Sequence, residues 1–187
     1  MLPQIKNILV GTDFSHSAWQ AMKYAVLLAK VHQAKINVLH VLPDLPQELN
    51  SSGVSKLLSF GPGLSGVPPI LHSSKKGAGQ TGAESGEFVE KIESVAKDKI
   101  KSVLLKLKSE EPDYNWDTKM DRLLVRIGGP VQNILEELKT GDYDLAVLGR
   151  RGHGKLRGPR TGGVAQGVLN RSPVPVLVVT PEQAKAE

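Results

Sequence analysis

The stretch Leu145-Ala-Val-Leu-Gly149-Arg-Arg-Gly152, followed after nine residues by Gly162-Gly163, decides the fold of this chain. The apolar run before the glycines predicts a buried strand, and the run Val174 to Val179 predicts another strand after them. Glycine lets backbone N–H groups approach an anion closely, because it has no side chain to block the approach. The pattern therefore predicts a strand, a glycine-rich loop, a helix start and a strand, with a nucleotide phosphate as the ligand of the loop.

Apolar segments extend this alternation towards the N-terminus. Strands are expected at Ile5–Val10, Ile36–Val41, Lys119–Arg126, Asp144–Leu148 and Val174–Val179, with a turn at Gly11-Thr12-Asp13. Helices are expected after a cap at Ser15 or Ser17, over about Glu84–Lys108, after Pro130, and over Gly163–Asn170. The order of elements predicts an α/β fold: a doubly wound, open parallel five-stranded sheet, Rossmann-like, with helices on both faces.

A strand order of 3-2-1-4-5 makes the first and fourth strands neighbours. Asp13 and Gly149 then face one crevice at the carboxyl ends of these strands, where ligands of such sheets bind. The last strand is expected at an edge, because Pro173 and Pro175 cannot donate to a ladder on both sides.

The length of 187 residues fits a single domain spanning residues 1–187. Residues 44–86 are rich in Pro, Gly and Ser and predict a flexible insertion between the second strand and the second helix. Two G-x-G-x-x-G matches, Gly61–Gly66 and Gly77–Gly82, fall in this insertion and follow no convincing strand, so we do not interpret them as dinucleotide fingerprints.

The composition restricts the cellular compartment that we expect for the protein and the kinds of ligand that it could bind. The absence of cysteine excludes disulfides, the N-terminus lacks the features of a signal peptide, and no apolar run approaches about 18 residues, so a cytoplasmic protein without a membrane span is expected. The net charge of +5 is concentrated in the glycine loop, at Arg150, Arg151, Lys155, Arg157 and Arg160. This placement favours a phosphate ligand over nucleic acid, because the loop has no aromatic side chains on which bases could stack.

Several motifs in order resemble the universal stress protein family. They are Ile8-Leu-Val-Gly-Thr-Asp13-Phe-Ser15, Val38-Leu-His40-Val41, Gly128-Gly-Pro130, Leu145-Ala-Val-Leu-Gly149 with its spaced glycines, and Ser172-Pro-Val-Pro-Val-Leu-Val-Val179. The resemblance covers nearly the whole chain outside the insertion. It implies a homodimer that pairs through the strand at 174–179, and a family with an ATP-binding and a non-binding branch.

The ATP-binding branch carries G-x2-G-x9-G followed by Ser or Thr. Gly149, Gly152 and Gly162 fit this spacing, but Gly163 stands where the family has a hydroxyl. A hydrogen bond to a charged group contributes about 1.5–3 kcal/mol, or roughly ten- to a hundredfold in affinity. Because the N–H groups of Gly162 and Gly163 remain at the helix start and Thr161 is near, ATP binding is expected to be weakened or rearranged rather than abolished.

The resemblance implies ATP, with or without Mg²⁺, as the ligand. In it Asp13 takes the ribose or adenine end, and the backbone of Val41 faces the adenine. The full set of implied binding residues is Gly11, Thr12, Asp13, Val41, Leu148, Gly149, Arg151, Gly152, Gly162, Gly163 and Val164.

Catalytic residues cannot be identified in the sequence. The five histidines have no metal-ligand spacing, and no nucleophile is paired with a base. The leading hypothesis is therefore a dimeric, ATP-binding stress-response protein that acts as a nucleotide-dependent switch. Three alternatives remain open: an interaction module of the same fold that binds no nucleotide, a slow ATPase, and a nucleic-acid-binding protein.

Overall fold

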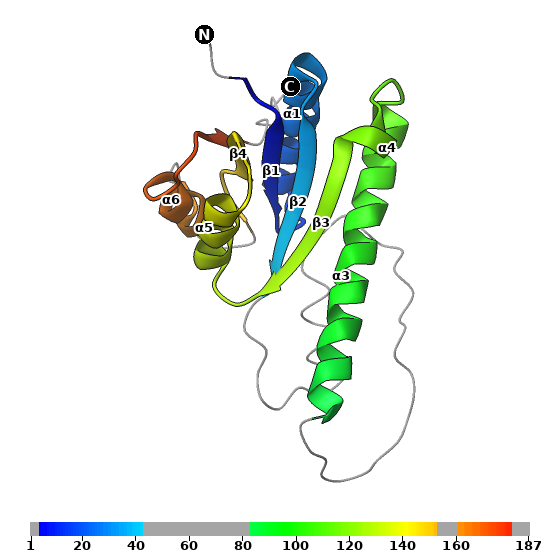
Figure 1. The fold of residues 1–187 in the computed structure, drawn as a ribbon, viewed down its shortest axis with the longest axis vertical. Helices are drawn as coiled ribbons and strands as arrows, with labels where there is room; N and C mark the ends of the chain where they lie inside the picture. The colour runs from blue at the N-terminus through cyan, green and yellow to red at the C-terminus, as the bar shows by residue number, and fades with distance from the viewer. Residues whose placement is uncertain (1–3, 43–82, 153–160, 181–187) are drawn as a thin grey trace, which may run out of the picture.

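The computed structural model describes residues 4–42, 83–152 and 161–180 (Figure 1). Its elements follow one another as β1 (Asn7–Thr12), α1 (His16–His32), β2 (Lys35–Leu42), α3 (Ala83–Glu110), α4 (Trp116–Lys119), β3 (Met120–Ile127), α5 (Pro130–Thr140), β4 (Leu145–Gly149), α6 (Gly163–Leu169) and β5 (Val176–Val179).

The five strands form one parallel sheet in the order β3-β2-β1-β4-β5. This confirms the predicted α/β class and the predicted strand order, including the position of β5 at an edge of the sheet that the described strands form. β1 lies in the centre, with Gly11 opposite Leu39 of β2 on one side and opposite Leu148 of β4 on the other.

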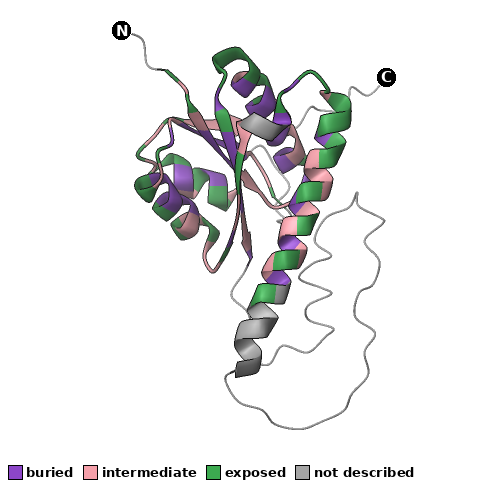
Figure 2. Cartoon of the chain, turned by 45° about the vertical axis from the view of Figure 1, so that its right-hand side comes forward, coloured by how far each residue is buried: buried purple, intermediate pink, exposed green. Residues whose placement is uncertain are grey.

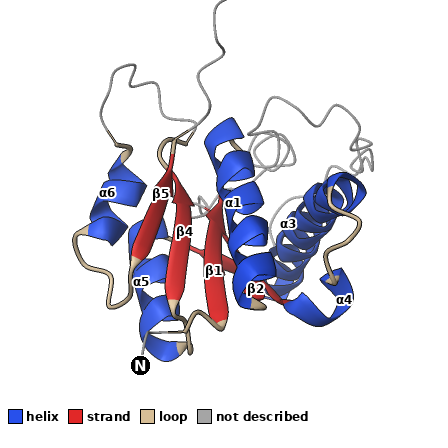
Figure 3. Cartoon of the chain, turned by 90° about the horizontal axis from the view of Figure 1, so that it is seen from above, coloured by secondary structure: helices blue, strands red, loops and turns tan. Residues whose placement is uncertain are grey.

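Helices cover both faces of the sheet, because alternate residues of each strand point to opposite faces. On one face α1 and α3 pack on a cluster that includes Ile8, Val10 and Val147. On the other face α5 packs on Leu9 and Ala146, and α6 adds Val168 to that cluster. Figure 3 shows the two helix layers with the sheet between them.

The ends of the helices carry the expected signals. Ser15 is the N-cap of α1, and its Oγ accepts a hydrogen bond from the N–H of Ala18 at 3.2 Å. Pro130 occupies the first turn of α5, where its missing N–H has no intrahelical partner to lose. Gly128, two residues before Pro130, has a φ of 120°, a conformation that side chains strongly disfavour.

The observed strand ends lie within two residues of the predicted ones, and two of the differences have a clear physical reason. The turn expected at Gly11-Thr12-Asp13 is wrong for its first two residues, because β1 continues to Thr12, which pairs with His40 of β2. β5 begins at Val176 rather than Val174, because Ser172 Oγ bonds both the N–H (3.2 Å) and the C=O (2.7 Å) of Val174 and holds that residue in a turn.

The insertion predicted at 44–86 falls mostly outside the described residues. Its last four positions, 83–86, belong to the start of α3, so the predicted boundary at about Glu84 is close to the observed one. Both G-x-G-x-x-G matches lie outside the described residues.

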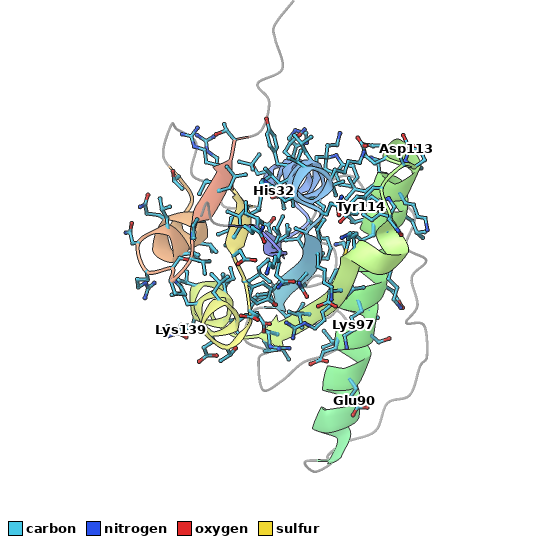
Figure 4. All side chains as sticks on the ribbon, turned by 45° about the horizontal axis from the view of Figure 1, so that its top comes forward. His32, Glu90, Lys97, Asp113, Tyr114 and Lys139 are labelled. Atoms are coloured by element: carbon cyan, nitrogen blue, oxygen red, sulfur yellow. The ribbon has the colours of Figure 1, made fainter. Side chains whose placement is uncertain are left out.

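α3 is the longest described helix, and it extends beyond the carboxyl ends of the strands (Figure 1). Figure 4 shows Glu90 on this extension and Tyr114 just after the opposite end of the helix. From residue 92 onward, buried residues of α3 alternate with more exposed ones (Figure 2), as in a helix that packs one face on the sheet. Among the described residues, no helix combines the length and the apolar character that a membrane span needs.

Candidate functional site at the carboxyl ends of β1 and β4

The carboxyl ends of β1 and β4 bring most of the predicted site residues together. The two strands are paired in register up to Gly11 and Leu148. Asp13, the residue after β1, therefore leaves the sheet beside Gly149 and the first residues of the glycine loop. This is the arrangement that the predicted strand order requires.

Asp13, just after β1, and Gly152, three residues after β4, come close together. A Cβ built on Gly152 would overlap Oδ2 of Asp13, so only a glycine leaves room for the carboxylate there. The other oxygen, Oδ1, accepts a hydrogen bond from the N–H of Ser15 at 3.0 Å. The turn into α1 therefore fixes Oδ1 of Asp13 through a hydrogen bond, and Oδ2 lies against Gly152 of the loop after β4.

Ser15 ties the glycine loop to the first turn of α1. Its hydroxyl donates to the carbonyl oxygen of Arg151 at 3.2 Å while it accepts from the N–H of Ala18. The backbone of Arg151 is therefore held by the same side chain that caps α1. Sequence reasoning identified Ser15 as a possible cap but missed this second contact.

The glycines at 149 and 11 are packing residues. A Cβ on Gly149 would lie 2.6 Å from the backbone carbon of Ser17 and 2.8 Å from the nitrogen of Ala18. A Cβ on Gly11 would lie 2.5 Å from Cδ2 of Leu148, a buried side chain. These glycines let α1 and the side chain of Leu148 approach the strands closely.

The second half of the glycine pattern opens α6. The N–H of Gly162 donates to the carbonyl oxygen of Arg150 at 2.7 Å, so the expectation that this N–H remains available at the helix start is wrong. Gly163 is the first residue of α6, and no described atom lies within 4 Å of a Cβ built on it. Val164, next to it, is 40% exposed.

Val41 belongs to β2 and packs against the core on the α5 face, as a strand residue. Its neighbour His40 points to the opposite face, and Nδ1 of His40 lies 2.7 Å from the carbonyl oxygen of Thr12. Because a carbonyl can only accept, Nδ1 carries the proton. Burial lowers the pKa of His40 below its usual value, and Lys99 lowers it further, whereas the bond to Thr12 and the charge of Asp13 oppose this change.

Three residues that the site prediction missed meet beside Asp13. Phe14 adopts a left-handed φ of 62°. Its ring lies 4.5 Å from the ring of His40, centroid to centroid, and Nζ of Lys99 on α3 lies 4.4 Å from the same centroid. Burial lowers the pKa of Lys99. His40 stood in a quoted motif, but no sequence signal links Lys99 to this place.

Metal ligands are not gathered here. Within residues 4–42, 83–152 and 161–180, no group of three or more His, Asp and Glu side chains could hold an ion. Asp13 is a single carboxylate, which suits hydroxyl or amide donors of a ligand.

The family of the chain follows from comparison with known proteins. The family model of the universal stress protein family matches residues 4–59 and 64–180, so the chain belongs to that family. Universal stress protein MJ0577 of Methanocaldococcus jannaschii is 25% identical over 174 residues, which cover 93% of this chain and 94% of the relative.

Solved structures support the same fold. Universal stress protein UspA from Lactobacillus plantarum superposes with a TM-score of 0.61 at 21% identity, over 95% of this chain and 99% of the other. A universal stress protein family member from Arabidopsis thaliana, solved with AMP bound, has a TM-score of 0.52 at 13% identity, over 97% of this chain and 95% of the other.

Proposed function

We propose that this universal stress protein binds an adenine nucleotide, ATP in the first place, at the carboxyl ends of β1 and β4. The observation that carries the proposal is the position of the Asp13 carboxylate against Gly152, with Oδ1 held by the N–H of Ser15. A carboxylate placed at a strand end can accept hydrogen bonds from ribose hydroxyls. The Arabidopsis relative with bound AMP has the same fold, which supports an adenine nucleotide as the ligand.

The phosphate end of the ligand is assigned to the start of α6 and the loop before it. The first N–H groups of a helix have no intrahelical acceptor and favour negative charge. Gly163 and Val164 supply such groups, and the space next to Gly163 contains no described atom within 4 Å. Arg150 and Arg151 lie at the start of the loop and add positive charge. Mg²⁺ is proposed to accompany ATP as its counter-ion, not as a resident metal.

Measured ATP affinity of the purified protein tests this function. We expect binding in the micromolar to millimolar range, because the family hydroxyl is absent at position 163. No binding at millimolar ATP would favour the open alternative, an interaction module of the same fold. Phosphate release measured in the same samples separates a switch, which holds ATP, from a slow ATPase.

Restoring the hydroxyl should tighten binding. Gly163→Ser is expected to lower the dissociation constant for ATP by about tenfold, since one hydrogen bond to a charged group contributes about 1.5–3 kcal/mol. The side chain has room, because no described atom lies within 4 Å of the added Cβ. Isothermal titration calorimetry of both forms measures the change.

Gly163→Ala is the matched control for that experiment. It adds the Cβ without the hydroxyl, so any tightening that it shares with Gly163→Ser comes from the backbone and not from a phosphate contact. An unchanged affinity in Gly163→Ser would place the phosphates elsewhere.

A dimer that pairs along β5 completes the proposal. Residues 175 and 179 direct their carbonyl groups to β4, where the N–H groups of Ala146 and Arg150 donate to them. Alternate residues of a parallel strand bond to opposite neighbours, so Val176 and Val178 direct their backbone groups away from β4. Such an edge is a template for a strand of a second copy.

Val178→Pro should therefore yield monomers. Proline removes an outward N–H and leaves the ladder between β4 and β5 intact. Light scattering after size exclusion measures the mass, and Val178→Thr, which keeps the N–H, is expected to remain dimeric. A dimer that survives Val178→Pro would assign the interface to another surface.

A further inference from the structure

Phe14 is the residue with the least expected backbone conformation in the site. Its φ of 62° lies in the left-handed region, which a bulky side chain rarely adopts because of the steric strain that it causes. Such a conformation persists only where the surrounding structure holds it. In this protein, hydrogen bonds to the backbone and contacts to the ring hold Phe14.

Two hydrogen bonds fix the backbone that leads from β1 into Phe14. Its N–H donates to Oγ1 of Thr12 at 3.2 Å, which closes a short turn. Nδ1 of His40 donates to the carbonyl oxygen of Thr12 at 2.7 Å, so the end of β2 holds the residue from which the turn departs. The turn is therefore anchored in the sheet.

The ring of Phe14 is held as well. The ring of His40 is tilted by 44° against it, with the centroids 4.5 Å apart. Nζ of Lys99 lies 4.4 Å from the Phe14 centroid, within the range of a cation–π contact. One ring thus joins the turn after β1, the end of β2 and the middle of α3.

The turn decides where the Asp13 carboxylate lies. The φ and ψ of Phe14 set the position of the Ser15 N–H relative to Asp13, and this N–H bonds Oδ1 of Asp13 at 3.0 Å. Oδ2 is then the oxygen that faces Gly152. If Phe14 relaxes to an ordinary backbone conformation, the Ser15 N–H moves and the carboxylate loses this orientation.

We propose that Phe14, held by His40 and Lys99, is a positioning residue that fixes the Asp13 carboxylate for the ribose hydroxyls of the bound nucleotide. The inference rests on the proposed function, since it concerns the same site. It deepens that function in one respect: the preference for a ribose over a sugar without hydroxyls is set by a contact that reaches the site from α3.

The test compares ATP with 2′,3′-dideoxy-ATP, which lacks the hydroxyls that Asp13 would accept from. The protein is expected to bind ATP at least about tenfold more tightly than the dideoxy analogue. Phe14→Gly tolerates the left-handed φ but removes the ring, and it should reduce this preference to within about twofold by weakening ATP alone. Phe14→Tyr keeps the ring and should keep the preference.

Lys99→Met provides a second variant that does not alter the turn itself. It removes the cation from the Phe14 ring and is expected to reduce the ribose preference by about threefold, whereas Lys99→Arg retains a cation and should retain the preference. Thermal melts of each variant report folding separately from binding.

The outcomes separate the two proposals. An unchanged ribose preference in folded Phe14→Gly, or in Lys99→Met should Phe14→Gly not fold, overturns the positioning role and leaves nucleotide binding intact. Equal affinities of the unmodified protein for ATP and dideoxy-ATP also overturn it. If the unmodified protein binds neither compound, the proposed function itself is wrong.

Discussion

Gly152→Ala is expected to weaken ATP binding by about tenfold or more while the fold remains intact. The added methyl group would overlap Oδ2 of Asp13, so the carboxylate has to shift from its position beside the loop, whereas no backbone atom has to move. Moving the carboxylate would remove the charge-assisted hydrogen bonds that we propose it makes to the ligand, each worth about 1.5–3 kcal/mol. Titration calorimetry with ATP measures the loss, and urea unfolding shows whether stability is retained.

Gly129→Ala is the matched control for this experiment. It places a methyl group 3.2 Å from Oε1 of Gln132, again the end of a flexible side chain, but before α5 and not beside Asp13. It should leave the affinity for ATP unchanged within about twofold. An unchanged ATP affinity in Gly152→Ala would show that the carboxylate takes no part in binding.

Gly149→Ala is expected to have the largest effect on stability, a loss of about 2–3 kcal/mol in the free energy of unfolding. The added Cβ would lie 2.6 Å from the carbon and 2.8 Å from the oxygen of Ser17, and 2.8 Å from the nitrogen of Ala18. All three are backbone atoms in the first turn of α1, so relief requires that the helix move away from β4. Urea unfolding at constant m-value gives the change directly.

The stability control comes from the same glycine pattern. Gly163→Ala adds a methyl group with no described atom within 4 Å, at the first residue of α6. Alanine is a better helix former than glycine by about 0.8–1 kcal/mol in a helix interior, so a small gain in stability is expected. A loss in Gly149→Ala no larger than the change in Gly163→Ala would contradict the packing role of Gly149.

The spaced glycines therefore serve different purposes, which the spacing alone does not reveal. Gly149 lets the first turn of α1 pack closely, and Gly152 leaves room for the carboxylate of Asp13. Gly162 donates its N–H to the carbonyl oxygen of Arg150. Of these four glycines, only Gly163 has no described atom within 4 Å of an added Cβ. The glycine pattern predicted that the backbone comes close to something, and the structure identifies a different neighbour for each position.

The strand order was predictable because the central strands are continuous apolar runs. Ile8-Leu-Val10 and Leu145-Ala-Val-Leu148 are buried on both faces, as the middle of a parallel sheet requires. Strand ends were less predictable. Gly11 and Thr12 carry turn signals, yet pairing with β2 on both residues, and with β4 at Gly11, outweighs these local preferences.

The site was predictable only where it depends on strand order. Asp13 and Gly152 meet because β1 and β4 are neighbours. Lys99 reaches Phe14 from a helix 85 positions further along the chain, and no local pattern encodes that contact. The left-handed conformation of Phe14 could not be predicted for the same reason, since its ring contacts a residue that is distant in the sequence.

The bond between the N–H of Gly162 and the carbonyl of Arg150 has a consequence for how this protein can change. It joins the residue that follows β4 to the residue that precedes α6. The start of α6 is therefore tied to the end of β4 by main-chain atoms, so replacing the Arg150 side chain is expected to leave this junction in place.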